Sequence, residues 1–228
     1  SCPFAKDCMS KAHVDKGTGK KFLRDGKDTK FRCFSASQEV LYKNTYNSRK
    51  HNFDLVKKES TENIVKLIKD SLPKKATTVR IHVGGDFFNQ KYFDAWLQVA
   101  KDIPNVLFYA YTKALPFWIN RMNEMPSNFK LNASKGGKRD DLIKEHNLKE
   151  AVVVYSEKQA EELGLEIDHD DTHAYKGDVS FALLIHGSQP KGSEASNALQ
   201  DLKKEGWTGY TKKGRSKELE SSNNKLGA

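Results

Sequence analysis

The sequence predicts an α/β fold in which parallel strands and helices alternate, arranged as a (β/α) barrel that is either TIM-barrel-like or partial. Along residues 78–205, short apolar segments of strand character alternate with segments of helical periodicity, which is typical of βαβ units. The expected strands at 151–155 and 179–185 are almost continuously apolar, as in strands covered on both faces. Several strands end in polar residues. In a barrel those ends meet on one face, whereas in an open doubly wound sheet only the ends beside the switch point meet.

The first well-defined element is a helix over residues 59–72. Ser60 can cap its amino end, and Ile64 and Ile68 recur with the spacing of one helix face. Pro73 ends the helix because its ring is incompatible with a continuing helical backbone.

The elements that follow alternate in type. Strands are expected at residues 78–83, 106–111, 129–132, 151–155 and 179–185. Helices are expected at residues 90–102, 116–123, 138–146, 157–163 and 193–205. In the helix over 90–102, Phe93, Trp96, Leu97 and Ala100 are expected to face inward.

The chain is expected to form a single α/β domain over 1–228, with 1–50 as a leader and 211–228 as a polar tail. The leader is expected to be mostly loop, because Gly and charged residues interrupt any apolar period, although a helix is able to begin within 35–49. No apolar run approaches the roughly 18 residues of a membrane span. With no signal-peptide pattern either, a soluble intracellular protein without a membrane partner is expected.

All three cysteines of the chain, Cys2, Cys8 and Cys33, lie in the leader. An odd number excludes a complete set of internal disulfides, and a shared ligand role explains both the number and the clustering. Three thiolates on a looped segment suit a [4Fe-4S] cluster whose fourth iron stays open to water or substrate. Zinc is an alternative, with His13 or His51 as a fourth ligand, although neither has zinc-ribbon spacing. Three ordinary free thiols are the other alternative.

Three motif sets resemble a family of uncharacterised bacteriophage gene products. They are the cysteine segments 1–8 and 31–36, the strand ends 80–87 and 109–113, and the segment 185–190. The resemblance covers nearly the whole chain. It implies a phage origin, and hence the cytoplasm of the infected host cell, but no particular reaction.

A weaker resemblance is to radical S-adenosylmethionine enzymes, which hold a cluster by three cysteines beside a partial barrel. Gly84, Gly85 and Asp86 are similar to the glycine-rich acidic motif that contacts the methionyl amine in those enzymes, with Asp in place of the usual Glu. The resemblance implies S-adenosylmethionine as a second cofactor. The spacing between Cys8 and Cys33 departs from the tightly packed cysteines of that family.

Three further residues are candidates for catalysis. Asp86 follows two glycines that allow close approach of a ligand, and it could act as general base or hold a substrate amine; capping the next helix is the alternative. His82 alternates with its apolar neighbours, so it is expected either in the barrel interior or as a hydrogen-bonded core histidine. His186, at another strand end, could donate to an oxyanion or to cluster sulfides, or else cap a helix.

The expected substrate-binding residues also follow strands. They are Gly84, Gly85, Lys113, Lys135 and Ser188. The lysine ammonium groups could bind a carboxylate or phosphate, although isolated lysines are usually only solvated. The acidic stretch 168–173 resembles a metal site in composition but lacks a fixed ligand period, so a solvated loop is favoured.

Lys and Arg outnumber Asp and Glu by 39 to 30, giving a net charge of +9. This surplus favours polyanions, and Trp96, Trp118 and Trp207 are possible stacking residues, but a lysine-rich soluble surface is the favoured explanation of the charge. The sequence lacks a phosphate-binding loop and a serine nucleophile elbow.

Three functions therefore remain. The first is an enzyme that uses an open iron as a Lewis acid for hydrolysis or hydration, for example of an ester, with a small-molecule substrate. The second is a radical S-adenosylmethionine-type redox enzyme. The third is a nucleic-acid-binding protein with a structural metal.

Overall fold

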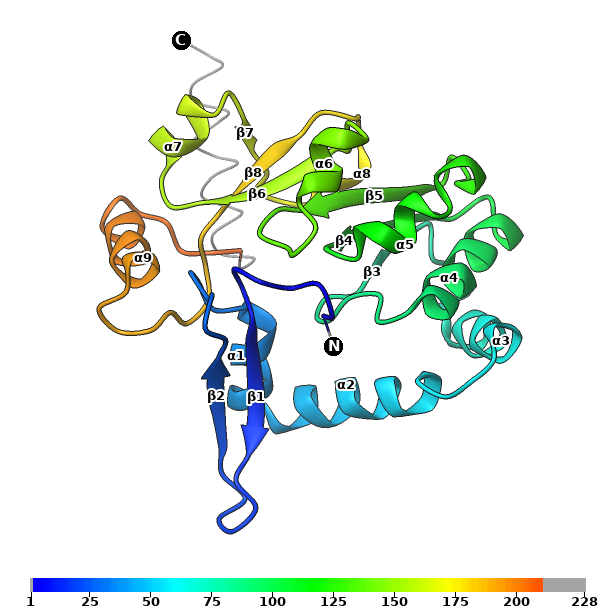
Figure 1. Cartoon of the computed structure of the whole chain (residues 1–228), viewed down its shortest axis with the longest axis horizontal. Helices are drawn as coiled ribbons and strands as arrows, with labels where there is room; N and C mark the ends of the chain where they lie inside the picture. Colours follow the sequence, from blue (N-terminus) through cyan, green and yellow to red (C-terminus); the bar gives the residue numbers. More distant parts are fainter. Residues whose placement is uncertain (1, 211–228) are drawn as a thin grey trace.

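The computed structural model describes residues 2–210, which form an α/β fold around one parallel sheet (Figure 1). The sheet has six strands in the order β3-β4-β5-β6-β8-β7, and every neighbouring pair is parallel. The strands are β3 (Thr78–Ile81), β4 (Leu107–Thr112), β5 (Phe129–Ser134), β6 (Glu150–Val154), β7 (Glu166–Ile167) and β8 (Phe181–Leu184). The expected class and the five expected strands are confirmed, and β7 is an additional short strand.

The helices between the strands are short except for three. They are α3 (Thr61–Ser71), α4 (Gln90–Asp102), α5 (Leu115–Ile119), α6 (Asp141–Glu145), α7 (Glu157–Glu162), α8 (Thr172–Tyr175) and α9 (Glu194–Lys204), with a 3-10 turn η1 (Met122–Glu124). Side chains of Ser60, Asn89, Ser156 and Ser193 cap α3, α4, α7 and α9 by accepting a hydrogen bond from the first turn.

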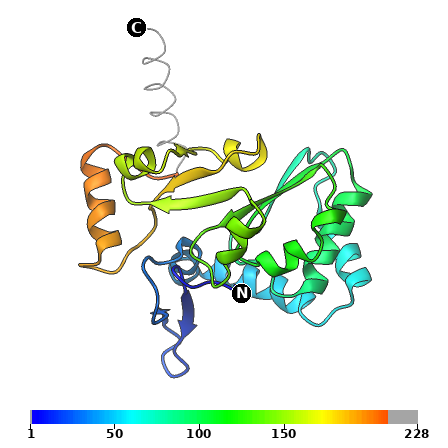
Figure 2. The same ribbon diagram turned by 45° about the horizontal axis from the view of Figure 1, so that its top comes forward.

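Most of these helices cover one face of the sheet (Figure 2). Ile64 of α3 and Phe93 of α4 pack with Ile81 and Phe108 of the first two strands. A second cluster joins β6 and β8 to α7 and α9. Most helices lie on one face because successive strands are added mainly in one direction across the sheet. Right-handed connections between strands added in one direction place their helices on the same face.

The sheet is nevertheless open. Within residues 2–210, β3 and β7 are edge strands and do not pair with each other, so the TIM-type closed barrel expected as one alternative is not formed. Six strands with a two-residue edge strand fall short of the eight that close such a barrel.

The leader is more ordered than expected. It forms an antiparallel hairpin of β1 (Ser10–Val14) and β2 (Lys21–Asp25), followed by α1 (Phe34–Leu41) and α2 (Lys43–Val56). The expectation of loop over most of residues 1–50 was therefore wrong, and only the helix expected within 35–49 was right. The expected tail at 211–228 lies outside the described residues.

No helix in the described part of the chain is both long and apolar enough to cross a membrane.

Candidate functional site

The segment between Cys2 and Cys8 is joined to the loop that follows β5. Ala5 pairs in antiparallel fashion with Gly137, and the backbone N–H groups of Lys6 and Asp7 both donate to the carbonyl of Gly136, at 3.3 and 2.9 Å. The N–H of Lys138 donates in return to the carbonyl of Phe4 at 2.8 Å. Because β5 is parallel to its neighbours, this loop lies at the carboxyl edge of the sheet, where ligand sites of parallel sheets form.

The segment around Cys33 is joined to the loop that follows β8. The side chain of Gln189 accepts a hydrogen bond from the N–H of Arg32 at 2.7 Å and donates to its carbonyl at 3.3 Å. A Cβ atom on Gly187 would lie 3.1 Å from Cβ of Phe34, which is a tight contact, and its φ of +79° favours glycine.

The loop after β3 makes the third contact with the leader. A Cβ atom on Gly84 would lie 2.1 Å from Oγ of Ser35, two residues after Cys33. Arg49 of α2 fixes this contact, because its Nη1 donates to both Oγ and the carbonyl of Ser35, at 2.8 and 2.9 Å. Three strand-end loops therefore hold the two cysteine-bearing segments at the same edge of the sheet.

The three cysteines are free thiols, and each is half-buried. Burial is the main cause that raises the pKa of Cys2, and charges on Asp86, Cys33 and Cys8 raise it further. Burial also raises the pKa of Cys8 to about 11, against the lowering effect of the Lys113 ammonium. These couplings place all three thiols in one electrostatic neighbourhood with Asp86 and Lys113. Thiols with raised pKa values are weak nucleophiles at neutral pH.

Asp86 is a buried carboxylate that joins the ends of β3 and β4. Its Oδ1 accepts hydrogen bonds from the N–H of Phe87 at 2.8 Å and from Oγ1 of Thr112 at 2.6 Å, and its Oδ2 accepts from the N–H of Lys113 at 2.8 Å. Burial raises its pKa, although these donors oppose the shift. The helix that follows is capped by Asn89, so the capping role considered for Asp86 was wrong.

Lys113 is a buried cation whose ammonium clamps the end of β5. Its Nζ donates to the carbonyl and the hydroxyl of Ser134, at 2.7 and 3.0 Å, and to the carbonyl of Lys135, at 2.6 Å. These three protein acceptors engage the ammonium protons. Lys113 therefore acts on the neighbouring thiols through its charge and not by donating hydrogen bonds to them. The ammonium of Lys135 is half exposed and lies 3.4 Å from a carboxylate oxygen of Glu150.

His82 leaves the strand instead of continuing it. Its φ of +60° turns the ring against Phe87 and Tyr92, with Nε2 3.0 Å from the Tyr92 hydroxyl of α4. Burial lowers its pKa to about 3. The contact with Tyr92 agrees with the expected hydrogen-bonded histidine, and the catalytic role expected for His82 stays a prediction.

His186 lies next to the leader, and its ring centroid is 4.9 Å from that of Phe34. Burial lowers its pKa to about 4, and the charge of Arg80 lowers it further. Ser188 is exposed. The structure places Cys2, Cys8, Cys33 and Asp86 in one neighbourhood. The metal-binding, catalytic and substrate-binding roles expected for these and the other residues stay predictions.

Sequence reasoning missed a charged group on the sheet face opposite the helices. The Asp171 carboxylate accepts hydrogen bonds from Nη1 of Arg80 at 2.6 Å and from the hydroxyls of Tyr109 and Tyr111 at 3.1 and 2.8 Å. Burial and the charge of Asp171 both raise the pKa of Tyr111. Because Arg80 also acts on His186, this group lies within electrostatic range of the cysteine edge.

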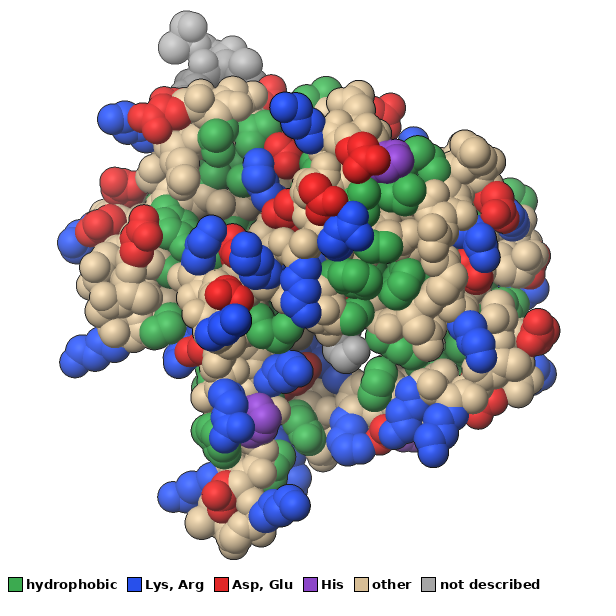
Figure 3. Space-filling model, in the orientation of Figure 1, with side chains coloured by type: hydrophobic (Ala, Val, Ile, Leu, Met, Phe, Trp, Pro, Cys, Tyr) green, Lys and Arg blue, Asp and Glu red, His purple; other side chains and the backbone are tan. Residues whose placement is uncertain are grey.

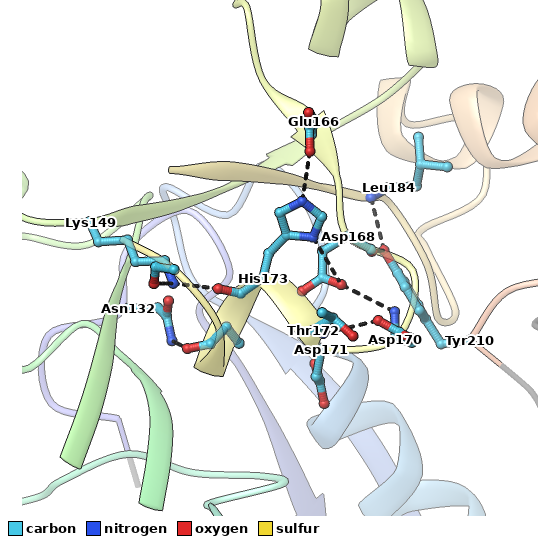
Figure 4. Close-up of polar contacts among 12 residues, drawn as sticks. Asn132, Lys149, Glu166, Asp168, Asp170, Asp171, Thr172, His173, Leu184 and Tyr210 are labelled. Carbon is cyan, nitrogen blue, oxygen red and sulfur yellow. Dashed lines mark hydrogen bonds and ion pairs between the residues drawn. The ribbon is translucent and has the colours of Figure 1, made fainter. Parts of the chain in front are cut away.

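The rest of the acidic stretch is structural. Figure 4 shows His173 between Glu166 and Asp168, with Nε2 2.9 Å from Glu166 Oε2 and Nδ1 3.6 Å from Asp168 Oδ1. Asp168 is fully buried, and α8 contacts β4 and β5. The expectation of a solvated loop at 168–173 was therefore wrong for its first residue.

Across residues 2–210, no three His, Cys, Asp or Glu side chains are arranged to hold a single metal ion. The chemical resources at the carboxyl edge are thus three neighbouring thiols, a buried ammonium and a hydrogen-bonded carboxylate. The amino end of α1, which carries partial positive charge and has no acidic residue in its first turn, begins directly after Cys33.

Comparisons with known proteins agree with this description at the level of family. The chain is 25% identical over 178 residues to the gene 88 protein of Mycobacterium phage L5, covering 74% of this chain and 68% of that protein. It is 33% identical over 90 residues to the gene 88 protein of Mycobacterium phage D29, covering 36% of this chain and 38% of that protein. No solved structure matches. Because the family model described as gene product 88 matches residues 1–203, the chain belongs to this family of bacteriophage gene products.

Proposed function

We propose that the chain binds a [4Fe-4S] cluster through Cys2, Cys8 and Cys33, leaves one iron open, and uses that iron as a Lewis acid in hydrolysis or hydration of a small molecule. The observation that carries the proposal is that two separate leader segments bring all three cysteines into one neighbourhood at the carboxyl edge of the sheet. The cytoplasm of the infected host cell is the proposed place of action.

The surroundings of the thiols act in both directions on thiolate formation. Burial and the charge of Asp86 oppose it, and a bound metal centre would supply the positive charge that favours it. The Lys113 ammonium and the amino end of α1 both favour negative charge on the sulfurs. Three cysteines suit a cubane cluster with one open iron, whereas a structural zinc site takes four protein ligands. Three protein ligands leave one iron for water or substrate.

The protein groups would act around that open iron. Asp86 keeps capacity on Oδ2 to accept one more hydrogen bond, so it is able to orient a substrate donor or a water molecule. Lys113 holds the ends of β4 and β5 together and supplies positive charge without releasing its donors. When bound, the cluster would supply Lewis-acid polarisation of a substrate oxygen.

A second candidate is an S-adenosylmethionine-dependent redox enzyme. The placement of Gly84, Gly85 and Asp86 beside the cysteines favours it. The long spacing between Cys8 and Cys33, which departs from the tightly packed cysteines of that family, weighs against it. Lewis-acid chemistry is therefore the preferred proposal.

The test is anaerobic purification with iron and sulfide counting, followed by electron paramagnetic resonance of the reduced protein with and without S-adenosylmethionine. Wild type is expected to contain about four irons and four sulfides, and Cys33→Ala to lose them. A four-iron signal that is unchanged by S-adenosylmethionine supports Lewis-acid chemistry. A signal that shifts on its addition supports the radical enzyme instead. Zinc, no metal, or full iron in Cys33→Ala contradicts the ligand assignment.

The Asp86→Asn variant tests ligand binding separately from cluster assembly. The amide oxygen still accepts from the N–H of Phe87 and from Thr112, whereas the N–H of Lys113 loses its acceptor and the charge is removed. We expect the iron content to stay near that of wild type while ligand-induced changes in the resonance signal weaken. An unchanged response to ligand would return Asp86 to a purely structural role.

A further inference from the structure

The hairpin of β1 and β2 projects from the body of the molecule as an arm (Figures 1 and 2). One of its faces is turned toward α1, because Lys21 on that face donates from Nζ to the carbonyl of Glu39 at 3.3 Å. Ala12 and Leu23, which lie opposite each other in the register, are half-buried on the same face. The other face is therefore turned away from the protein.

This outward face combines an aromatic ring with cations. It carries Lys11 opposite Arg24 and His13 opposite Phe22. Phe22 is 41% exposed, its ring is stacked on that of His13 with centroids 5.6 Å apart, and the Arg24 guanidinium lies 5.9 Å from its centroid. The ring is thus stacked on His13 and lies near a cation, and it stays partly exposed instead of being covered by the core.

The same face continues into a basic cavity at the base of the arm. Met9 and Gly26 extend the outward columns of the two strands, and the N–H of Gly26 donates to the Met9 carbonyl at 2.7 Å. Both residues line a cavity of about 460 Å³, whose charged lining residues are Lys6, Lys27, Lys138 and Asp28. A basic track therefore runs from the arm toward the cysteine-bearing edge of the sheet.

The charge of the protein is concentrated in this region. Residues 2–33 contain nine Lys and Arg against four Asp, so they supply more than half of the net charge of +9. Figure 3 shows basic side chains and a histidine gathered on the arm. A polyanion approaching the protein would be attracted to the arm before the rest of the surface.

We propose that the outward face of the β1–β2 hairpin binds single-stranded nucleic acid, with one base stacked on Phe22 and phosphates contacting Lys11 and Arg24. A single strand is favoured over a duplex because stacking on a protein ring requires an unpaired base, and every base offers a π-face. The three tryptophans considered from the sequence do not serve this role. Trp207 is buried, and Trp96 and Trp118 pack against the core.

The test is fluorescence anisotropy of labelled dT20 and rU20 oligonucleotides with the full chain at several salt concentrations. Phe22→Ala is expected to weaken binding about 5- to 150-fold, the range for loss of one base–aromatic stack, and Phe22→Trp to restore it. The double reversal Lys11→Glu with Arg24→Glu is expected to weaken binding and to lower the slope of log affinity against log salt by about 1.4, for two phosphate contacts to a single strand.

The matched control is the double reversal Lys74→Glu with Lys75→Glu. It changes the net charge equally, at exposed positions before the amino end of β3. In the Lys11→Glu with Arg24→Glu variant, positions 11 and 24 still carry like charges opposite each other, as in wild type. Its folding is therefore expected to be comparable to that of wild type. Equal weakening by the control, unaffected binding by Phe22→Ala, or displacement of dT20 by polyglutamate as effectively as by unlabelled dT20 would each overturn the proposal. Because Phe22 lies away from the cysteines, its variants keep the iron content of wild type, which separates this proposal from the cluster.

Discussion

Gly84→Ala tests how tightly the loop after β3 is seated on the cysteine-bearing leader. The new Cβ atom would lie 2.1 Å from Oγ of Ser35 and 2.7 Å from Cζ of Arg49, closer than real Cβ contacts come. Neither neighbour yields easily, since Ser35 is buried and its Oγ accepts from Arg49 Nη1 at 2.8 Å. Backbone strain is not the cause, because the φ of Gly84 is outside the positive range.

The expected cost is that of overpacking a closed contact, about 1–3 kcal/mol of unfolding free energy. For a chain of this length, that corresponds to a fall in melting temperature of about 2–12 °C. Helix α1 begins directly after Cys33, so movement of Ser35 is also expected to displace this cysteine and lower the iron content after anaerobic reconstitution.

Thermal unfolding by circular dichroism measures the first effect and iron counting the second. Gly17→Ala is the matched control, because the nearest atom to its Cβ would be at an ordinary 3.5 Å. In a Ser35→Ala background the shortest clash disappears, so Gly84→Ala should cost less there, with a coupling of about 0.5 kcal/mol or more. A Gly84→Ala protein that melts with wild type and shows no coupling would refute the tight seating of this loop.

Three further substitutions test the surroundings of the site. Lys113→Met leaves the carbonyl and hydroxyl of the half-buried Ser134 without this donor, and is expected to cost about 1–3 kcal/mol in urea unfolding. Asp171→Asn removes a charge that raises the pKa of Tyr111, so ultraviolet titration should show that tyrosine ionising at lower pH than in wild type. The pKa of His82 is about 3 in the folded chain and 6.5 ordinarily, so its contribution to stability is present above pH 6.5 and is lost as the pH falls toward 3. Urea unfolding across this range should show a slope of up to about 1.4 kcal/mol per pH unit from this group, which His82→Asn removes.

The strands and helices of the sheet were predictable because each carries its own local pattern. The apolar spacing of α3 and the serine before it are visible within twelve residues, and the structure confirms both the helix and its cap. Closure into a barrel was not predictable in the same way. It depends on pairing between the first and last strands, and a two-residue β7 at the edge gives no periodic signal.

The leader was misread for a physical reason. The hairpin strands alternate correctly, with Ala12 and Leu23 facing α1, but Lys and Arg on the outward face dilute their apolar signal. The helix α2 has no buried residues, so periodicity had nothing to detect. The pattern Lys-x-His and Phe-x-Arg on either side of Gly17-Thr18-Gly19 would have revealed both the hairpin and its aromatic face.

The candidate site likewise contains one part that was predictable from the sequence and one part that was not. The convergence of the cysteines was predictable from their number and clustering, because these are properties of the sequence alone. The Asp171 group was not, since its three partners are 91, 62 and 60 residues away in the chain. The segment between β7 and β8 brings this carboxylate over the face of β3 and β4 that lies opposite most of the helices.

Under the cluster proposal, binding of the metal centre and docking of the leader on the sheet are thermodynamically coupled, because of the way the leader is attached. Within residues 2–210, the leader adds no strand to the six-stranded sheet. It is held by the bridge of Ala5 to Gly137, by the backbone hydrogen bonds beside that bridge, and by side-chain and loop contacts. A centre that binds only the docked arrangement therefore stabilises docking by its binding free energy. Removing iron with a chelator should raise amide hydrogen exchange in residues 2–33 while β4 and β5 stay protected. Uniform loss of protection across the sheet would show that the leader and the sheet unfold together, and equal protection with and without iron would show that the centre is not held by the leader.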